Sequence, residues 1–349
     1  GKPKIKFKKV YFRFMILVTG GTGMVGAHLL LACVKNNFPV RALYRSASRL
    51  QEVADFFSHN FPDQPTYFEQ IQWHQTDLND IVNLEKAFDN IDQIYHCAAK
   101  VSFASYHSEK LIKTNREGTA NLVNLAVKYK VKKMAYVSSI AALGVEPTVK
   151  KVNEDFSWNP SLLHTPYAYS KYGAELEVWR GSQEGLEVVI VNPGIILGSY
   201  FWNRSSGTLI KRVAKGMNFY PLGNAGVVAL EDVVHCLIKL MNSPIKNERF
   251  ILVSKNIPYQ NLIQKIALRL GVSSPKIPLT KSLLYTLFIL DKVAYALGLK
   301  KSFLNQATVE SLCSKQTYDG SKIEEKLDFK YKSIDAVLAA IGKAYKASH

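Results

Sequence analysis

A short glycine-rich stretch near the start of the chain, VTGGTGMVG at 18–26, constrains the fold more than any other feature. It follows the apolar run 14–18 directly, and that run has the length and composition of a buried β-strand. Gly20 permits a tight turn, Gly23 lets the backbone approach a pyrophosphate, and Gly26 lets the next helix pack closely on the sheet. Because the first N–H groups of a helix are unpaired, this arrangement predicts a phosphate-binding site.

Strand-like and helix-like segments alternate along the first 200 residues. Short apolar segments bounded by polar residues or glycine predict strands at 14–18, 39–44, 71–75, 92–96, 134–138 and 187–191. Helical patterns fit between them at 23–36, 47–58, 80–89, 106–129 and 165–184. This alternation predicts an α/β Rossmann fold, a doubly wound parallel sheet with helices on both faces.

The pattern changes after residue 198, where loops rich in Gly, Asn and Ser precede helices expected near 231–242, 258–270, 280–298 and 333–345. We therefore expect three parts. Residues 1–13 form a basic extension, and 14–198 form an NAD(P)-binding Rossmann domain. Residues 199–349 are mostly a C-terminal substrate-binding lobe, with elements that return to the Rossmann domain.

The net charge of the 349-residue chain is +17, and the first 14 residues supply six of these charges without an acid, so +11 remains elsewhere. We interpret the start as a solvated extension and expect no nucleic-acid partner, with attachment to an acidic surface or nucleic acid as the alternative. Four widely spaced cysteines favour reduced thiols and a cytoplasmic location. The apolar run 283–290 is too short to span a membrane. It predicts a buried or pocket-covering helix, with an interfacial anchor as the alternative. No metal site is expected.

The end of the second predicted strand indicates which nicotinamide cofactor the loop binds. An acid there would pair with the adenosine ribose and repel a 2′-phosphate, but segment 40–46 contains none. Arg45 lies about 20 residues beyond the loop, and Ser46 and Arg49 follow it. A guanidinium matches a phosphate with two parallel hydrogen bonds. The sequence therefore favours NADP, with NAD as the alternative.

A tyrosine can donate a proton to a forming alkoxide when a nearby cation lowers its pKa, and Tyr-x-x-x-Lys on a helix places both groups on one face. The pattern occurs four times. Tyr167/Lys171 is selected because it opens a long predicted helix shortly after the strand that ends in Ser138 and Ser139. The remaining pairs are interpreted as exposed helix faces: Tyr106/Lys110, Tyr129/Lys133 and Tyr318/Lys322.

These motifs, together with VNPGIILG, VALEDVV and YDGSKIEEKLDF, resemble the extended short-chain dehydrogenase/reductase family, also called the NAD-dependent epimerase/dehydratase family. The resemblance runs from about residue 14 to the end, and it is strongest to the dihydroflavonol-reductase-like branch. It implies catalytic roles for Tyr167, Lys171 and Ser139, with Ser138 as a close rival. Asn115 then serves either in a proton relay or only in a local polar contact.

The resemblance also implies a set of ligand contacts. Cofactor contacts fall at Thr19, Gly20, Gly23, Met24, Val25, Gly26, Arg45, Asp77, Leu78, Ala98, Ala99, Tyr167, Lys171, Pro193 and Ile196. Candidate substrate residues are Phe103, Ser139, Tyr200 and Trp202, with Phe201, Tyr220 and helix 283–290 as further apolar candidates. Relatives form homodimers through helices equivalent to 106–129 and 165–184, where Leu122, Val123, Leu125, Ala126 and Val178 either supply apolar surface or face the sheet.

The residues after Ser139 bear on the reaction. Sugar dehydratases of this family place Asp-Glu there, whereas this chain has Ile140-Ala141-Ala142, which disfavours dehydration. The leading interpretation is an NADP(H)-dependent oxidoreductase that reduces a ketone or aldehyde, or oxidises the alcohol. Tyr167 transfers the proton, and Lys171 lowers its pKa. The alternatives are a nucleotide-sugar 4-epimerase with retained NAD and a non-catalytic NAD(P)-binding sensor or assembly protein.

Overall fold

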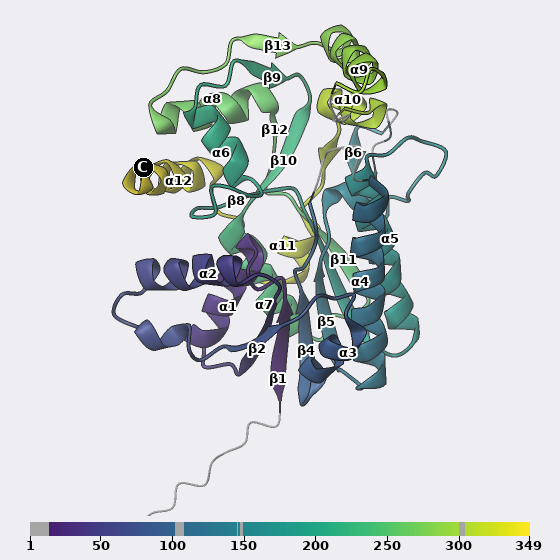
Figure 1. Cartoon of the computed structure of the whole chain (residues 1–349), viewed down its shortest axis with the longest axis vertical. Helices are drawn as coiled ribbons and strands as arrows, with labels where there is room; N and C mark the ends of the chain where they lie inside the picture. Colours follow the sequence, from purple (N-terminus) through teal and green to yellow (C-terminus); the bar gives the residue numbers. More distant parts are fainter. Residues whose placement is uncertain (1–13, 102–107, 145, 147–148, 300–303) are drawn as a thin grey trace, which may run out of the picture.

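A seven-stranded parallel sheet forms the centre of the molecule (Figure 1). The computed structural model describes residues 14–101, 108–144, 146, 149–299 and 304–349. The strands run in the order β11-β7-β5-β4-β1-β2-β3. Their bounds are β1 (Met15–Thr19), β2 (Val40–Tyr44), β3 (Gln72–Gln75), β4 (Ile91–His96), β5 (Lys133–Val137), β7 (Glu187–Pro193) and β11 (Glu248–Leu252). The Rossmann-like fold and all six expected strands are confirmed, while β11 was not predicted.

Helices cover both faces of this sheet (Figure 1). One layer contains α1 (Met24–Lys35), α2 (Ala47–Asn60) and α7 (Leu230–Met241), which share an apolar core with the sheet. The other layer contains α3 (Ile81–Glu85), α4 (Ser108–Lys128) and α5 (Pro166–Gln183), and a 3₁₀ turn at Lys86–Phe88 follows α3. Because the strand order reverses between β1 and β4, the loops after these two strands diverge and leave a crevice at the carboxyl edge.

The apolar residues considered for a dimer surface lie inside this second layer. Leu122, Val123, Leu125, Ala126 and Val178 are all buried within the chain, in the core between α4, α5 and the sheet. They therefore do not supply a surface for a partner, because the sheet already covers them. The homodimer itself stays a prediction.

A smaller lobe stands over the carboxyl edge of the sheet (Figure 1). Its three-stranded sheet contains β8 (Ile195–Leu197), β10 (Asn224–Ala229) and β12 (Lys255–Pro258). It packs with α6 (Gly207–Ala214), α8 (Tyr259–Leu270) and α12 (Ile334–Ser348) around a separate core. The remaining elements are η1 (Pro65–Tyr67), η4 (Ile140–Leu143), β6 (Lys151–Val152), β9 (Phe219–Pro221), β13 (Ile277–Leu279), α9 (Lys281–Ala296), α10 (Gln306–Cys313), β14 (Thr317–Tyr318) and α11 (Lys322–Lys326). The division into two domains near residue 199 stays a prediction.

Helix α9, which contains the apolar run 283–290, is not buried. Only Leu284 and Asp291 of this helix are buried, whereas Ile289 and Leu290 are each 58% exposed. The interpretation of this run as a buried helix is therefore wrong, while a pocket-covering helix and an interfacial anchor stay predictions.

Two of the discarded Tyr-x-x-x-Lys pairs do not lie on helix faces. Tyr129 follows the end of α4, but Lys133 lies in β5 and is buried. Its Nζ donates hydrogen bonds to the carbonyl oxygens of Leu240 and Ser243, at 2.7 and 2.8 Å. Tyr318 likewise belongs to a strand, β14. These two interpretations are corrected, while Tyr106 lies outside the described residues.

We predict that Lys133→Met lowers the free energy of unfolding by about 1–3 kcal/mol, because two buried carbonyl oxygens lose their donor. Lys132→Met is the matched control. Lys132 is an exposed neighbour that pairs with Asp92, so its loss should cost about 0–1 kcal/mol. Urea denaturation of both variants measures the difference. Equal losses would contradict this account of Lys133.

Candidate active site

The glycine loop brings three segments of main chain into close contact. Gly20 has a φ of +68°, and a Cβ there would lie 2.6 Å from the nitrogen of Ala98 in the loop after β4. A Cβ on Gly26 would collide with the carbonyl oxygen of Gly20. Gly23 is the N-cap of α1 and provides no side-chain hydrogen bond, which leaves the first N–H groups of that helix for a ligand.

A crevice of about 340 Å³ opens beside this loop. Most of the predicted cofactor residues line it: Thr19, Gly20, Gly23, Arg45, Asp77, Leu78, Ala98 and Ala99, together with Asn115. Met24 and Val25 belong to the first turn of α1, and the Met24 side chain is buried in the core. Free helix N–H groups, a loop that only glycine fits and nearby guanidinium groups suit an anionic dinucleotide.

Arg45 points toward the third strand as well as toward the crevice. Its Nη1 lies 3.3 Å from Oδ2 of Asp77, and Ser46 and Arg49 also line the crevice. Partial burial raises the pKa of Asp77, but hydrogen bonds from Asn79 and Arg45 outweigh this and hold it below its ordinary value. The carboxylate therefore stays ionised and orients Arg45, whose side chain is 58% exposed.

An arginine that the sequence reasoning missed holds the glycine loop from the other lobe. Arg204 donates from Nη1 to the carbonyl oxygen of Thr22 at 2.6 Å, and it forms an ion pair with Glu52 of α2. Burial lowers its pKa to about 10, and repulsion by Arg49 acts in the same direction. No motif surrounds Arg204 in the sequence, so only the fold reveals this contact.

Tyr167 and Lys171 occupy successive turns at the start of α5. Thr165 caps this helix by accepting a hydrogen bond from the N–H of Ala168 at 3.1 Å, and Pro166 takes the first helical position. Lys171 is 2% exposed. Its Nζ donates to the carbonyl oxygen of Val137 at 2.8 Å and lies 4.7 Å from the centre of the Tyr136 ring.

Burial is the largest cause of the pKa shifts of Tyr167 and Lys171. It lowers the pKa of Lys171 to about 8, although Glu175 opposes the shift. Burial also raises the pKa of Tyr167, and a hydrogen bond with Ser139 opposes it. The prediction that Lys171 lowers the pKa of Tyr167 is therefore wrong for the protein chain by itself. Its ammonium group is instead bonded to Val137 and lies over the Tyr136 ring.

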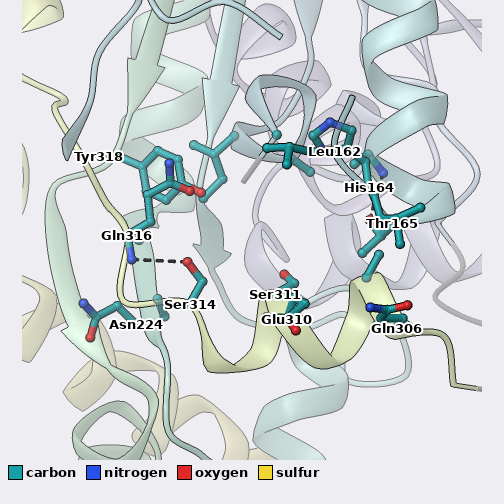
Figure 2. A pocket seen from close by; sticks show the side chains of 18 of the residues that line it. Leu162, His164, Thr165, Asn224, Gln306, Glu310, Ser311, Ser314, Gln316 and Tyr318 are labelled. Carbon is teal, nitrogen blue, oxygen red and sulfur yellow. Dashed lines mark hydrogen bonds between the residues drawn. The ribbon is translucent and has the colours of Figure 1, made fainter. Parts of the chain in front are cut away.

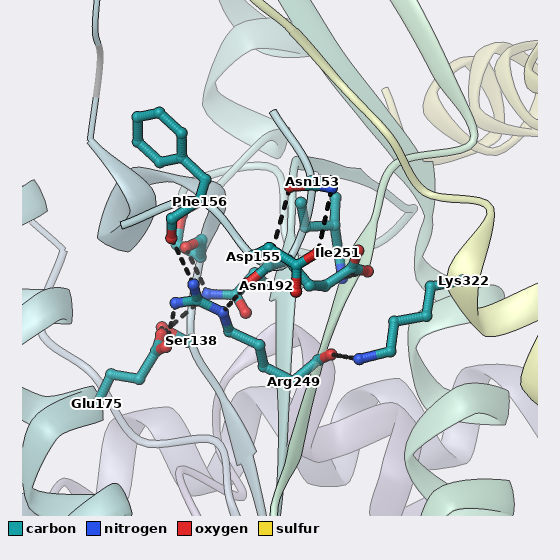
Figure 3. Close-up of polar contacts among 11 residues, drawn as sticks. Ser138, Asn153, Asp155, Phe156, Glu175, Asn192, Arg249, Ile251 and Lys322 are labelled. Atoms are coloured by element: carbon teal, nitrogen blue, oxygen red, sulfur yellow. Dashed lines mark hydrogen bonds and ion pairs between the residues drawn. The ribbon is translucent and has the colours of Figure 1, made fainter. Parts of the chain in front are cut away.

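The two candidate serines have different surroundings. Ser139 follows β5, caps η4 by accepting from the N–H of Ala141, and contacts Tyr167. Ser138 is buried, and its Oγ donates to Oε2 of Glu175 at 2.7 Å (Figure 3). Ser139 is thus beside the candidate proton donor, and Ser138 belongs to a separate polar cluster.

That cluster centres on the buried carboxylate of Glu175 (Figure 3). Asn192 of β7 donates to Oε2 of Glu175 at 2.9 Å and to the carbonyl oxygen of Ser139 at 3.0 Å. Arg249 of β11 lies 3.3 Å from Oε1 of Glu175, and it also donates to the main-chain oxygens of Glu154 and Phe156. The sequence reasoning missed this cluster. Its one signal was an acid one turn beyond Lys171, on the same helix face.

Asn115 of α4 makes contacts far from its own turn. It accepts a hydrogen bond from the N–H of Lys100 and donates to the carbonyl oxygen of the same residue, at 2.8 and 2.9 Å. Its Nδ2 also lies 3.1 Å from the Oγ of Ser170 in α5. Asn115 therefore ties the loop after β4 to both long helices. The hydrogen bonds of Asn115 are therefore not local, and they join it to Lys100 and Ser170 rather than to Lys171.

A second cavity of about 420 Å³ lies between the large sheet and the small lobe (Figure 2). Ile140 and Ala141, which follow Ser139, line it, as do Thr165 and Ala168, which flank Tyr167. The far walls come from β10, α10 and the segment 314–318. A molecule in this cavity would therefore approach the Tyr167 and Ser139 side chains from the lobe side.

The aromatic residues predicted to contact substrate lie elsewhere. The Tyr200 ring packs against Phe56, with ring centres 5.4 Å apart, and the buried Trp202 packs against Tyr345. Phe201 and Tyr220 are also core residues, because large aromatic side chains bury well, and Phe103 lies outside the described residues. After β7, it is Ile195 that lines the cavity. Two predicted cofactor contacts lie away from both cavities. Pro193 is the last residue of β7, and Ile196 packs against the core.

Comparison with known proteins agrees with this geometry. The model of the NAD dependent epimerase/dehydratase family matches residues 16–252, and the chain belongs to this family. A Synechocystis sp. protein, whose name provisionally assigns it as a dihydroflavonol 4-reductase, is 30% identical over 92% of both chains. Sterol demethylase protein B of Methylococcus capsulatus is 27% identical, covering 78% of this chain and 80% of that protein.

A solved structure shows the same fold. The crystal structure of gox2253 superposes with a TM-score of 0.80 and 24% identity, covering 96% of this chain and 98% of that one. The chain is therefore an NAD(P)-binding enzyme of the epimerase/dehydratase family with reductase relatives.

We predict a specific pH dependence of stability from Lys171. Its pKa is about 8 in the folded chain and 10.5 ordinarily, so between these values the unfolded chain binds more protons at this residue. The free energy of unfolding should then rise with pH from about 8 to 10, by up to ~1.4 kcal/mol per pH unit from this group. Lys171→Met removes the contribution. Denaturation at several pH values checks this, and parallel profiles for both proteins would contradict it.

Proposed function

We propose that this chain is an NADP(H)-dependent carbonyl reductase that also oxidises the corresponding alcohol. The observation that carries the proposal is the hydrogen bond between Tyr167 and Ser139, beside a cavity with few charged groups. No lysine or arginine is found among the described residues that line this cavity, and Glu310 brings a carboxylate to it. Such a wall suits a neutral carbonyl compound better than the diphosphate of a nucleotide sugar.

The proposed roles follow from the contacts of each side chain. Ser139 donates to the substrate oxygen and holds it against the phenol of Tyr167. Tyr167 donates its proton to that oxygen as charge develops, and its raised pKa keeps the phenol protonated at neutral pH. Lys171, whose ammonium group donates to the carbonyl oxygen of Val137, binds the nicotinamide ribose. When bound, NADPH supplies the hydride. Asn115 keeps the loop after β4 in place.

The NADP preference rests on Arg45, with Ser46 and Arg49 beside it in the crevice. We predict that NADPH binds at least several-fold tighter than NADH, because the guanidinium pairs with the 2′-phosphate. Arg45→Asp should reverse the order. Arg212→Asp, an exposed arginine of α6, makes the same charge change away from the crevice and should preserve it. Fluorescence titrations measure this, and equal affinities in the unaltered protein would refute the preference.

The two serines should separate activity from stability. Ser139→Ala removes the hydroxyl that holds the substrate oxygen, so we predict a roughly 10²-fold loss of kcat with little change in stability. Ser138→Ala removes a donor to buried Glu175 and should lower the free energy of unfolding by about 1–3 kcal/mol while preserving more of the rate. Steady-state kinetics and urea denaturation distinguish them. The reverse pattern would assign the catalytic role to Ser138.

The test of the whole proposal combines a carbonyl screen with a change at Tyr167. A panel of ketones and aldehydes with NADPH should yield a substrate. For that substrate, Tyr167→Phe should lower kcat by roughly 10²-fold or more, because the proton donor is lost, while NADPH affinity stays nearly unchanged.

Tyr129→Phe is the control for that change, since Tyr129 is exposed and its hydroxyl donates a hydrogen bond to Glu85 at the surface. It should have little effect. Full activity of Tyr167→Phe, or equal damage from Tyr129→Phe, would show that the active site is elsewhere.

A further inference from the structure

Arg204, in the small-lobe loop between β8 and α6, contacts the glycine loop from outside the cofactor crevice. Thr22 lines this crevice, whereas Arg204 does not. Nη1 of Arg204 donates to the carbonyl oxygen of Thr22 at 2.6 Å, and the guanidinium carbon lies 4.8 Å from the centre of the Phe201 ring. Burial, with repulsion by Arg49, lowers the pKa of Arg204 to about 10, so the side chain stays charged at neutral pH. A charged donor forms a stronger hydrogen bond than a neutral one.

The turn from Gly20 to Gly23 needs an outside restraint. Three of its four residues are glycines, and the N–H of Gly23 donates to the carbonyl oxygen of Gly20 at 2.8 Å. Glycine adopts more backbone conformations than other residues, so a turn of this composition loses much conformational entropy when it becomes ordered. The peptide group that joins Thr22 to Gly23 lies directly before the first turn of α1, and Arg204 binds its carbonyl oxygen. Arg204 therefore restrains the turn at its junction with the helix.

The loop that carries Arg204 is itself fixed against α2. The Tyr200 ring packs against Phe56 with ring centres 5.4 Å apart, and the Phe201 ring packs against the same side chain at 5.5 Å. Tyr200 and Ser205 both adopt left-handed backbone conformations, with φ of +80° and +52°. Such conformations are costly for residues other than glycine, and they persist where the surrounding structure fixes them. The loop therefore holds Arg204 in place.

An ion pair with α2 adds a second restraint on the guanidinium group. Arg204 pairs with Glu52, whose side chain is 56% exposed, while the Arg204 side chain is 17% exposed. The carboxylate offsets the repulsion between Arg204 and Arg49, which lines the crevice. One arginine of the small lobe is thus bonded to two separate segments beside the cofactor crevice, the turn before α1 and helix α2.

The same loop also connects to the cavity on the lobe side. Oγ of Ser206 donates to the carbonyl oxygen of Ile196 in β8, and the neighbouring Ile195 lines the cavity of about 420 Å³. A short segment of the small lobe therefore joins the glycine loop to the wall of this cavity.

We propose that Arg204 is a positioning residue for the nicotinamide cofactor. By holding Thr22 it preorganises the turn on which the pyrophosphate binds, so the small lobe contributes to cofactor affinity without touching the cofactor. A turn that is ordered beforehand loses less entropy when the ligand binds. The inference rests on the cofactor position in the proposed function, but it does not depend on the identity of the substrate.

Isothermal titration calorimetry with NADPH and with NADH tests the inference. Arg204→Met removes the donor and its charge, so both cofactors should bind at least ~10-fold more weakly. The two losses should be similar, because NADPH and NADH share the pyrophosphate. Arg204→Lys keeps a charged donor and should recover part of the affinity. Arg212→Met, which removes an exposed arginine of α6, should bind both cofactors normally.

Hydrogen exchange measured by mass spectrometry checks the restraint without a ligand. Peptides that cover 18–26 should exchange faster in Arg204→Met than in the unaltered protein, while peptides from β7 should exchange at the same rate. This comparison separates a local loss of order from a general loss of stability. Because coupling is reciprocal, NADPH should slow exchange in 199–206 of the unaltered protein, and it should do so less in Arg204→Met.

Unchanged cofactor affinity in Arg204→Met would overturn the inference. A loss confined to NADPH would also overturn it, because Arg204 would then act on the 2′-phosphate. Equally faster exchange in 18–26 and in β7, or no recovery of affinity in Arg204→Lys, would mean that Arg204 only stabilises the fold, and the inference would fail. Normal cofactor binding without reduction of any carbonyl compound would refute the proposed function and leave this inference in place.

Discussion

The buried carboxylate of Glu175 is the interaction on which the geometry of the site depends. It joins α5 to the ends of β5, β7 and β11 through Ser138, Asn192 and Arg249. A buried charge is costly unless it is paired and hydrogen-bonded, and these three side chains supply the donors to Glu175. Because Asn192 also holds the carbonyl oxygen of Ser139, the cluster fixes that serine relative to the helix that carries Tyr167.

The two cavities on either side of these groups differ in charge. The crevice beside the glycine loop contains Arg45 and Arg49, with Arg204 behind its loop, which suits an anionic cofactor. Glu310 reaches the cavity on the lobe side, and the rest of its described lining contains no lysine or arginine. The overall charge of +17 is therefore not spread evenly over the ligand-binding surfaces. This asymmetry is the main physical reason to favour a carbonyl substrate over a nucleotide sugar.

The sequence predicted those parts of the structure that depend on local pattern. The glycine loop could be predicted because a Cβ on Gly20 or Gly26 would collide with main-chain atoms, and the confirmed strands follow from short apolar runs. β11 was missed because it lies beyond residue 198, where the sequence was interpreted as a separate lobe, yet it returns to pair with β7 in the central sheet. Spacing alone also misjudged Lys133, since the chain turns into β5 between Tyr129 and Lys133. Arg204 and Arg249 act through tertiary contacts and carry no motif. The aromatic residues Tyr200 and Trp202 were predicted as substrate contacts from residue type alone, and in the structure they pack against the apolar cores.

The central claim is the proposal that this enzyme is a carbonyl reductase, which must exchange its nicotinamide cofactor on every turnover, whereas a 4-epimerase need not. The most direct measurement is the nicotinamide content of the purified protein, by mass spectrometry of an acid extract before and after incubation with excess NADPH. We expect little bound nicotinamide at the start and ready loading and release of NADPH. A full complement of NAD that copurifies with the chain and does not exchange would contradict the claim.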